Sequence, residues 1–358
     1  MSHLFRELLQ KVGSGTHTNK ALTRAEAALA LELMWTHRAT PAQIGAFLIA
    51  HRIRRPTVEE LAGMLDTYYR FGPRLAPITA NHPVLVMGVP YDGRSRTAPL
   101  APLTALVLAA AGCPVVQHGA AVMPTKYGLP LVKVWELLGV HWRDLTLEAL
   151  QHLLQVTHVG FLYIPRLFPL STILTPYREE IGKRPPLATL ELMWSPYGGE
   201  SLLAMGYVHP PTETLIRGAL GLHHVPRYLL VKGLEGSPDL PRDRKAIIGI
   251  FQAGAESSPS EFTRLTLSAR AQGLAGTDAP LTAPAETRLG ADLMQVITGE
   301  VETELGRSVI WNSGFYLWQV GAAADLNQGM AQAEALLRGG QVQAKQQELI
   351  QEINRISG

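Results

Sequence analysis

The sequence predicts an α/β protein in two parts, a small α-helical domain followed by a large α/β domain with a mainly parallel central sheet. Residues 1–75 contain helix starts without strand-like runs, whereas from residue 84 onward apolar β-branched runs alternate with helical stretches. The Pro/Gly-rich segment 72–83 separates the two patterns. We therefore place the helical domain at residues 1–75, joined by about 168–192, and the α/β domain at residues 80–165 and 195–358.

Helix caps define the N-terminal part, after a short apolar-periodic helix over residues 4–12. At three places a threonine stands where an N-cap side chain accepts a backbone hydrogen bond, and the residues that follow suit the first turn of a helix. The pairs are Thr23 with Glu26, Thr40 with Pro41, and Thr57 with Glu60. Capped helices in direct succession predict a helical domain.

Strand-like runs bounded by turn residues begin at residue 84, and helical stretches separate several of them. We expect strands at 84–89, 114–119, 159–165, 201–208, 227–233 and 245–252, and helices at 103–112, 212–223, 287–300 and 311–357. Because parallel strands need long crossover connections, this alternation predicts a largely parallel sheet.

The composition favours an ordered globular protein. The chain has 358 residues, of which 46% are hydrophobic, and its net charge of +2 excludes no class of partner. The positive excess lies in the first 100 residues, with 12 Lys/Arg against 7 Asp/Glu. The single cysteine, Cys113, allows no internal disulfide, the N-terminus lacks the apolar core of a signal peptide, and the longest apolar stretch, 103–116, is interrupted. We expect a cytoplasmic protein with no membrane partner.

The stretch GVPYDGRSRTAPLAP, residues 88–102, connects a predicted strand to a helix, and backbone amides at such a turn can bind an anion. Gly88, Asp92 and Gly93 keep the outline of a phosphate-binding loop. The prolines of the stretch have no amide hydrogen, however, and its alanines have no hydroxyl. Arg94 and Arg96 could restore anion binding in another pose, or they could be solvated residues of an ordinary connection.

A second polar cluster follows the next predicted strand, at the edge of an open α/β sheet where ligands bind. It consists of Gln117, His118, Gly119 and Lys126. A single histidine in such a place is more often a hydrogen-bonded structural residue than a catalyst. Both interpretations of His118 stay open.

The chain resembles the anthranilate phosphoribosyltransferase family, part of glycosyltransferase family 3, along most of its length. The resemblance lies in LTRAEAALALELMWTHRATPAQIGAFLIAHRIRRPTVEELAGMLD, GVPYDG, TALVLAAAGCPVVQHG, TPYREEIGKR and WNSGFYLWQVGAAADLNQGMAQAEALLRGG. It implies the nucleoside phosphorylase/phosphoribosyltransferase fold, a homodimer formed through the helical domain, and phosphoribosyl transfer from phosphoribosyl pyrophosphate with Mg²⁺.

The same resemblance exposes departures from the family's ligand motifs. The glycine-rich GTGGDG is represented by residues 88–93, the NIST-type segment by 99–102 and KHGN by 117–120. The acidic pair that holds magnesium in the family corresponds to Pro238 and Asp239, with Glu235 as a stand-in for the lost carboxylate. Arg178 matches an arginine that faces the aromatic acceptor, and Lys126 a basic residue near the second cluster. Phe168 replaces a histidine of the acceptor loop.

Two functions of different class remain open. In the first, the chain is a divergent phosphoribosyl or pentosyl transferase with a degenerate site and weakened or altered activity, not an efficient anthranilate enzyme. Gly88, Asp92, Gly93, Arg94, Arg96, Gln117, His118, Gly119, Lys126 and Arg178 would then bind a phosphorylated sugar and substrate, with Asp239 and Glu235 for Mg²⁺.

In the second, the chain resembles divergent paralogues in which an SYNGAR-like sequence replaces the glycine-rich loop and the dimer binds nucleic acid without sequence specificity. The candidate contacts are Arg52, Arg54, Arg55, Arg94, Arg96, Lys183 and Arg184. The alternative for the first three is a solvated helix end whose cations favour the C-terminal dipole. The transferase hypothesis is placed slightly ahead, because the anion-facing loops persist.

Overall fold

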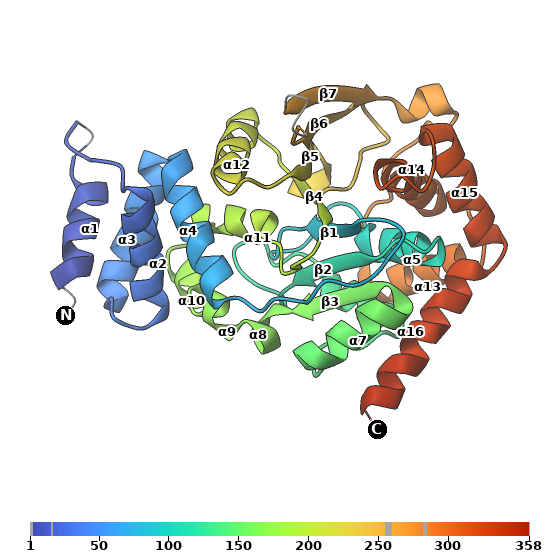
Figure 1. Ribbon diagram of the computed structural model, residues 1–358, viewed down its shortest axis with the longest axis horizontal. Coiled ribbons are helices and arrows are strands. Elements are labelled where there is room, and N and C mark those ends of the chain that lie inside the picture. Colours follow the sequence, from blue (N-terminus) through green and yellow to red (C-terminus); the bar gives the residue numbers. More distant parts are fainter. Residues whose placement is uncertain (1–2, 16, 255–259, 282–284, 358) are drawn as a thin grey trace.

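A seven-stranded sheet forms the centre of the protein (Figure 1). The computed structural model describes residues 3–15, 17–254, 260–281 and 285–357. The strands are β1 (Val84–Gly88), β2 (Val115–Gly119), β3 (Val159–Tyr163), β4 (Ser201–Gly206), β5 (Arg227–Val231), β6 (Ala246–Gln252) and β7 (Glu261–Leu267). Their order is β3-β2-β1-β4-β5-β6-β7. The first five strands in this order pair in parallel, and β6 pairs antiparallel with both β5 and β7, which confirms the predicted mainly parallel sheet.

The N-terminal helices pack together at one end of the molecule (Figure 1). They are α1 (His3–Gly13), α2 (Arg24–Trp35), α3 (Pro41–Arg54) and α4 (Val58–Phe71). All three predicted threonine caps are present. Each closes a capping box, in which the threonine side chain and the N3 side chain accept reciprocal backbone hydrogen bonds.

Short helices between β3 and β4 lie beside this N-terminal group. They are α8 (Ile164–Leu167), α9 (Pro169–Thr172), α10 (Thr175–Glu180), η1 (Pro186–Thr189) and α11 (Leu190–Met193). The last two elements contact α3 and α4 respectively (Figure 1). The predicted domain limits remain a prediction, but segment 164–193 provides a surface that connects the helices to the sheet.

Helix α5 (Ala101–Ala110) is the centre of the second layer. Every residue from Ala101 to Ala109 is buried, because α5 is covered by the sheet on one side and by C-terminal helices on the other. The remaining helices are α6 (Leu131–Leu137), α7 (Leu147–Thr157), α12 (Pro210–Leu222), α13 (Ala285–Ile297), α14 (Glu304–Gln319), α15 (Leu326–Arg338) and α16 (Gln341–Ser357), with 3₁₀ turns η2 (Leu234–Gly236) and η3 (Ala269–Gln272). In the described part of the chain no helix combines the length and apolar character needed to cross a membrane.

The structure corrects three elements of the sequence-based prediction. The closing helix expected over 311–357 is divided into α14, α15 and α16, because Gly321 and Gly340 adopt positive φ angles and Asp325 caps a new helix. Helices α6 and α7 occupy a stretch without a prediction. Strand β7 was also missed, since as an edge strand with mostly exposed side chains it lacks a continuous apolar run.

Candidate functional site

The loop between β1 and α5 lies at the carboxyl edge of the sheet and is held from both sides. On one side Arg94 exchanges backbone hydrogen bonds with Leu129, at 3.0 and 2.7 Å. On the other, the amide of Leu281 donates to the carbonyl of Arg96 at 3.0 Å, and that of Ala98 to the carbonyl of Ala279 at 2.9 Å. These contacts fix three successive amides, those of residues 95–97, in one concave arrangement, which we call the amide cradle.

A carboxylate of the chain itself occupies the amide cradle. The amides of Ser95, Arg96 and Thr97 donate to the Glu235 carboxylate at 3.1, 3.0 and 3.1 Å. Lys126 forms an ion pair with the same carboxylate, and the Arg94 Nε donates to it at 3.2 Å. Burial raises the pKa of Glu235, but hydrogen bonds from Lys126 and from the amides lower it more, so that the net pKa lies well below its usual range. Glu235 is therefore an anion at neutral pH.

Arg94 is buried, with 4% of its side chain exposed, and is paired within the protein. Its Nη1 lies 2.7 Å from the Asp239 Oδ2 and 2.8 Å from the Ser237 Oγ. The amide of Leu100 donates to the same Asp239 oxygen at 3.2 Å. Arg94 is therefore not part of an exposed basic surface, and its charge is already paired with a carboxylate of the protein.

The predicted magnesium ligands do not fit a divalent cation as arranged here. Asp239 and Glu235 each bind a cationic side chain, so a metal ion would have to displace Arg94 or Lys126 from them. Among the described residues, no group of three or more His, Cys, Asp or Glu side chains is placed to hold a metal ion.

The glycine and aspartate positions of the loop are structural. A Cβ on Gly88 would lie 2.0 Å from the Leu192 carbonyl oxygen. Gly93 has a positive φ of 74°, and a Cβ there would lie 2.5 Å from the Gly128 backbone. The Lys126 Nζ donates to the Gly93 carbonyl at 2.9 Å. Asp92 is buried and lies 3.8 Å from the Arg184 guanidinium. These contacts hold the loop between β1 and α5 in place.

An aromatic side chain of the same loop packs against the end of β2. Tyr91 is buried, and its hydroxyl shares a 2.6 Å hydrogen bond with the His118 Nδ1. Trp194 packs edge-on against the same imidazole at a centroid distance of 5.3 Å. Burial lowers the pKa of His118 to about 4, so the ring is neutral at physiological pH and brings no charge to an anion.

Two further residues of the second predicted cluster serve packing. The Gln117 amide donates to the Ala101 carbonyl at 2.7 Å and accepts from the Trp135 indole at 3.2 Å, which links β2 to α5 and α6. Gly119, at the end of β2, lies against the ring of Phe161.

Arg178 and Glu191 form a second buried pair of opposite charges. The Arg178 Nη1 lies 2.6 Å from the Glu191 Oε1, with 4% and 7% of the two side chains exposed. The other Glu191 oxygen accepts from the amide of Tyr91 at 3.2 Å. Phe168 lies nearby in an aromatic cluster with Trp194, at a centroid distance of 5.3 Å. The arginine at the predicted acceptor position is thus neutralised by a carboxylate from α11.

The predicted basic residues divide between a cleft and the protein interior. Arg52, Arg184 and Gly236 line one pocket between the N-terminal helices and the sheet, and Arg52 with Arg55 line an adjoining one. We call these two pockets the Arg52 cleft. Arg54 instead pairs with the buried Glu60.

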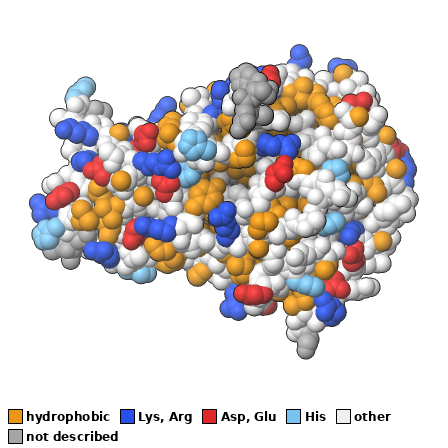
Figure 2. Space-filling view, viewed as in Figure 1, with side chains coloured by type: hydrophobic (Ala, Val, Ile, Leu, Met, Phe, Trp, Pro, Cys, Tyr) orange, Lys and Arg blue, Asp and Glu red, His pale blue; other side chains and the backbone are white. Residues whose placement is uncertain are grey.

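Exposed cations lie near this cleft without forming a uniform basic surface. Lys183 is exposed, and 78% of the Arg96 side chain is exposed, although its backbone amide lies in the cradle. On the face shown in Figure 2, Lys and Arg side chains lie among acidic and apolar ones rather than in one continuous stripe.

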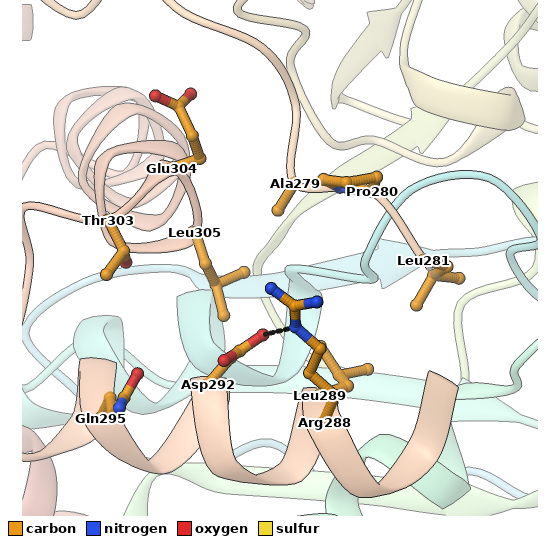
Figure 3. A pocket seen from close by; sticks show the side chains of 10 residues that line it. All are labelled: Ala279, Pro280, Leu281, Arg288, Leu289, Asp292, Gln295, Thr303, Glu304 and Leu305. Atoms are coloured by element: carbon orange, nitrogen blue, oxygen red, sulfur yellow. Dashed lines mark ion pairs between the residues drawn. The ribbon is translucent and has the colours of Figure 1, made fainter. Parts of the chain in front are cut away.

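Figure 3 shows another pocket. It is formed by α13, the start of α14 and residues 279–281. Its charged side chains include Arg288 and Asp292, which are 3.9 Å apart on α13. None of the residues that we predicted to bind a ligand lines it.

Comparisons with known proteins agree on one family. Residues 6–72 match the helical bundle domain of a glycosyl transferase family, and residues 93–343 match its α/β domain. The anthranilate phosphoribosyltransferase of Azorhizobium caulinodans is 30% identical over 355 residues, covering 96% of this chain and 95% of the relative. That of Moorella thermoacetica is 28% identical over 351 residues, covering 97% and 98%.

Solved structures support the same fold. Anthranilate phosphoribosyltransferase from Thermus thermophilus superposes with a TM-score of 0.77 at 19% identity, over 98% of this chain and 99% of that one. The Saccharomyces cerevisiae enzyme in complex with PRPP and Mg gives a TM-score of 0.82 at 14% identity, over 99% of both chains.

Sequence reasoning missed the partners of the predicted cations. Glu191 does not belong to any motif that the sequence analysis identified. Asp239 was interpreted as a metal ligand rather than as the partner of Arg94. Tyr91 did carry a signal, because a bulky aromatic residue stands where the resemblance predicts glycine.

Proposed function

Because the chain belongs to the anthranilate phosphoribosyltransferase family, we propose that it binds a phosphorylated ligand at the carboxyl edge of its sheet and transfers a phosphoribosyl group to anthranilate only weakly. One observation carries this proposal: the arginines at predicted donor and acceptor positions are both paired with carboxylates of the same chain. The chain keeps the scaffold of a transferase but neutralises the charges that a substrate would need.

On the donor side, the anion must compete with ion pairs already formed. Arg94 is bound to Asp239 and Glu235, and Lys126 to Glu235. A charged hydrogen bond to a ligand is worth about 1.5–3 kcal/mol, so the loss of four or five such bonds removes about 6–15 kcal/mol, which is four or more powers of ten in affinity or rate.

On the acceptor side, Arg178 would need to attract the carboxylate of an aromatic acid. Glu191 already occupies that partner position at 2.6 Å, and Phe168 and Tyr91 add buried aromatic bulk nearby. An incoming carboxylate would face repulsion from Glu191 as well as a loss of hydration. Transfer to an uncharged acceptor would avoid this penalty.

The homologous yeast structure contains PRPP and Mg. In this chain the two carboxylates nearest to the cradle are committed to Arg94 and Lys126, which argues against the same use of magnesium. We therefore propose that any phosphorylated ligand binds without a metal bridge to Asp239 and Glu235.

A direct assay tests the proposal. Formation of phosphoribosyl anthranilate, followed by the loss of anthranilate fluorescence with PRPP and Mg²⁺, is expected to give a kcat/KM below about one ten-thousandth of that of the Saccharomyces cerevisiae enzyme measured in parallel. A value within tenfold of the yeast enzyme would overturn the proposal.

A second candidate, sequence-independent nucleic-acid binding, is favoured by the Arg52 cleft. Arg52, Arg55 and Arg184 line adjoining pockets, and the exposed Lys183 follows directly before Arg184 in the chain. Because Arg54 and Arg94 are held by internal carboxylates, the candidate surface is smaller than the sequence predicts. Binding to the phosphate backbone of a nucleic acid without sequence specificity needs only cationic side chains of this kind.

Binding of a fluorescent single-stranded oligonucleotide distinguishes this candidate. The double variant Arg52→Gln/Arg184→Gln is expected to bind at least about tenfold more weakly at low salt, whereas Arg355→Gln, the same change on the distant α16, is expected to bind like the wild type. Affinity that does not fall between low and high salt would exclude this function.

The homodimer is also a proposal. Leu4 on α1 and Ile53 at the end of α3 are exposed by 42% and 75%, which leaves apolar surface on the N-terminal helices. Light scattering after size exclusion is expected to give twice the mass of the 39.0 kDa chain.

A further inference from the structure

The amide cradle and the side chains around it direct seven hydrogen-bond donors at the Glu235 carboxylate, which is more than its lone pairs can accept. Oε1 receives four, from Arg94 Nε, the Arg96 amide, and the amide and hydroxyl of Thr97, while Oε2 receives three, from Lys126 and from the amide and hydroxyl of Ser95. A carboxylate offers about four lone-pair sites. A phosphate group has three strong acceptor oxygens, so the donor set suits a larger anion better than it suits Glu235.

Glu235 supplies one of the two carboxylates that offset the positive charge around the cradle. Arg94 and Lys126 face Glu235 and Asp239, two cations against two carboxylates. Arg96 adds a third cation, with its Nε 3.9 Å from the Glu235 Oε2. Without the Glu235 carboxylate, Asp239 alone would face these three cations, and the three amides of the cradle would lose their acceptor.

Glu235 reaches the cradle from the surface of the protein. Its side chain is 4% exposed, whereas the residue as a whole is of intermediate exposure. Its backbone has a positive φ of 53°, and the following Gly236, with a φ of 84°, lines the Arg52 cleft. The Arg52 cleft thus begins one residue from Glu235 along the chain, in the direction in which its side chain would have to turn to leave the cradle.

We propose that Glu235 is an internal substitute for a bound anion, and that it blocks phosphate or diphosphate from the amide cradle until its side chain swings out. The proposal rests on the proposed function in one respect, since it describes how the same site is closed. The closed state is the one that the structure describes, and an incoming diphosphate opens it by competing for the seven donors.

Titration calorimetry with inorganic pyrophosphate, in the absence of divalent cations, tests this proposal. Glu235→Gln is expected to bind pyrophosphate at least about tenfold more tightly than the wild type, because it removes the competing charge and keeps a similar volume. Glu235→Asp, one methylene shorter, is expected to lie between the two. Glu200→Gln makes the same chemical change at an exposed position before β4, and is expected to match the wild type.

Hydrogen exchange locates the site of binding. In Glu235→Gln, pyrophosphate is expected to slow exchange of the amides of residues 95–97. Binding no tighter than wild type, in a variant with an unchanged circular dichroism spectrum, would overturn the proposal, as would tighter binding without protection of these amides. If Glu235→Gln does not fold, the same two measurements on Glu235→Asp, pyrophosphate affinity and protection of the amides of residues 95–97, test the proposal.

The two proposals fail separately. Full anthranilate transfer by the wild type would refute weakened activity and leave the pyrophosphate result intact. Conversely, equal pyrophosphate binding by wild type and Glu235→Gln would refute internal blockade without bearing on the transferase assay.

Discussion

The Arg178 guanidinium and the Glu191 carboxylate lie 2.6 Å apart in the protein interior, where Glu191 also accepts the amide hydrogen of Tyr91. Within the described residues, the Nε and Nη2 of Arg178 have no hydrogen-bond partner. The Glu191 carboxylate therefore compensates the free-energy cost of burying the charge of Arg178. The pair connects α10 and α11 to the loop that forms the amide cradle.

Glu191→Gln is expected to lower the free energy of unfolding by about 3–5 kcal/mol, because it leaves the charge of Arg178 buried without compensation. Urea denaturation measures the change. Glu200→Gln, an exposed counterpart with 76% of its side chain in solvent, is expected to stay within about 0.5 kcal/mol of the wild type. A loss below about 1 kcal/mol for Glu191→Gln would mean that the pair does not hold this region together.

Two glycines provide a matched test of packing at the site. Gly88→Ala is expected to cost about 3 kcal/mol or more, because the new Cβ would lie 2.0 Å from the backbone oxygen of Leu192. Gly221→Ala, in α12, meets no atom within 4 Å and is expected to stabilise by up to about 1 kcal/mol through helix propensity. Chemical denaturation of the two variants is expected to move their midpoints in opposite directions. Equal midpoints would refute the close contact between β1 and α11.

The sequence predicted the elements whose formation depends on local patterns. The threonine caps at residues 23 and 57 were found because the capping partner lies three residues along the chain, and the cap at residue 40 because Pro41 suits the first helical position. Strands β1 to β5 were found because buried parallel strands are continuously apolar, and the antiparallel β6 was found because its sequence AIIGIFQ is also a nearly continuous apolar run. The exposed β7 and the short α6 have no such pattern and were missed.

The candidate site depends on partners that are distant in sequence, which periodicity does not reveal. Arg94 meets Asp239 across 145 residues, and the amide of Arg96 meets Glu235 across 139. Sequence reasoning placed Arg96 near an anion, but could not separate its backbone, which lies in the cradle, from its side chain, which is 78% exposed. Whether a cationic side chain is available to a ligand therefore depends on its pairing with carboxylates inside the protein, and not on its residue type alone.

Cys113 is expected to be unreactive in the folded protein. It is fully buried before β2, and burial raises the pKa of its thiol to about 12, so the reactive thiolate is scarce at about pH 8. Reaction with Ellman's reagent is expected to be at least about a hundredfold slower in buffer than in guanidinium chloride. Since the chain has one cysteine, the signal reports this site alone. Rapid labelling of the native protein would indicate that the region around α5 and β2 opens readily.

Stability at acid pH is expected to depend on Glu60. This buried carboxylate caps α4, accepts the amide of Leu22 at 2.8 Å, and pairs with Arg54 and with His51, whose Nε2 lies 3.5 Å away. Burial raises the pKa of Glu60, but the His51 and Arg54 side chains lower it more, to about 2, from an ordinary value of 4.5. Because the folded pKa is the lower one, the stabilisation is complete above about pH 4.5 and is lost as the pH falls toward 2.

Glu60→Gln is therefore expected to be less stable than the wild type at about pH 6, with a difference that shrinks by about 3 kcal/mol between pH 4.5 and 2. Urea denaturation at a series of pH values provides the measurement. Glu59→Gln, at the exposed neighbouring position of the same helix turn, is expected to keep the pH dependence of the wild type. If Glu60→Gln lost stability with acid as steeply as the wild type, a different carboxylate would have to control acid unfolding, and the cluster of Glu60 with His51 and Arg54 would contribute little to the helical part.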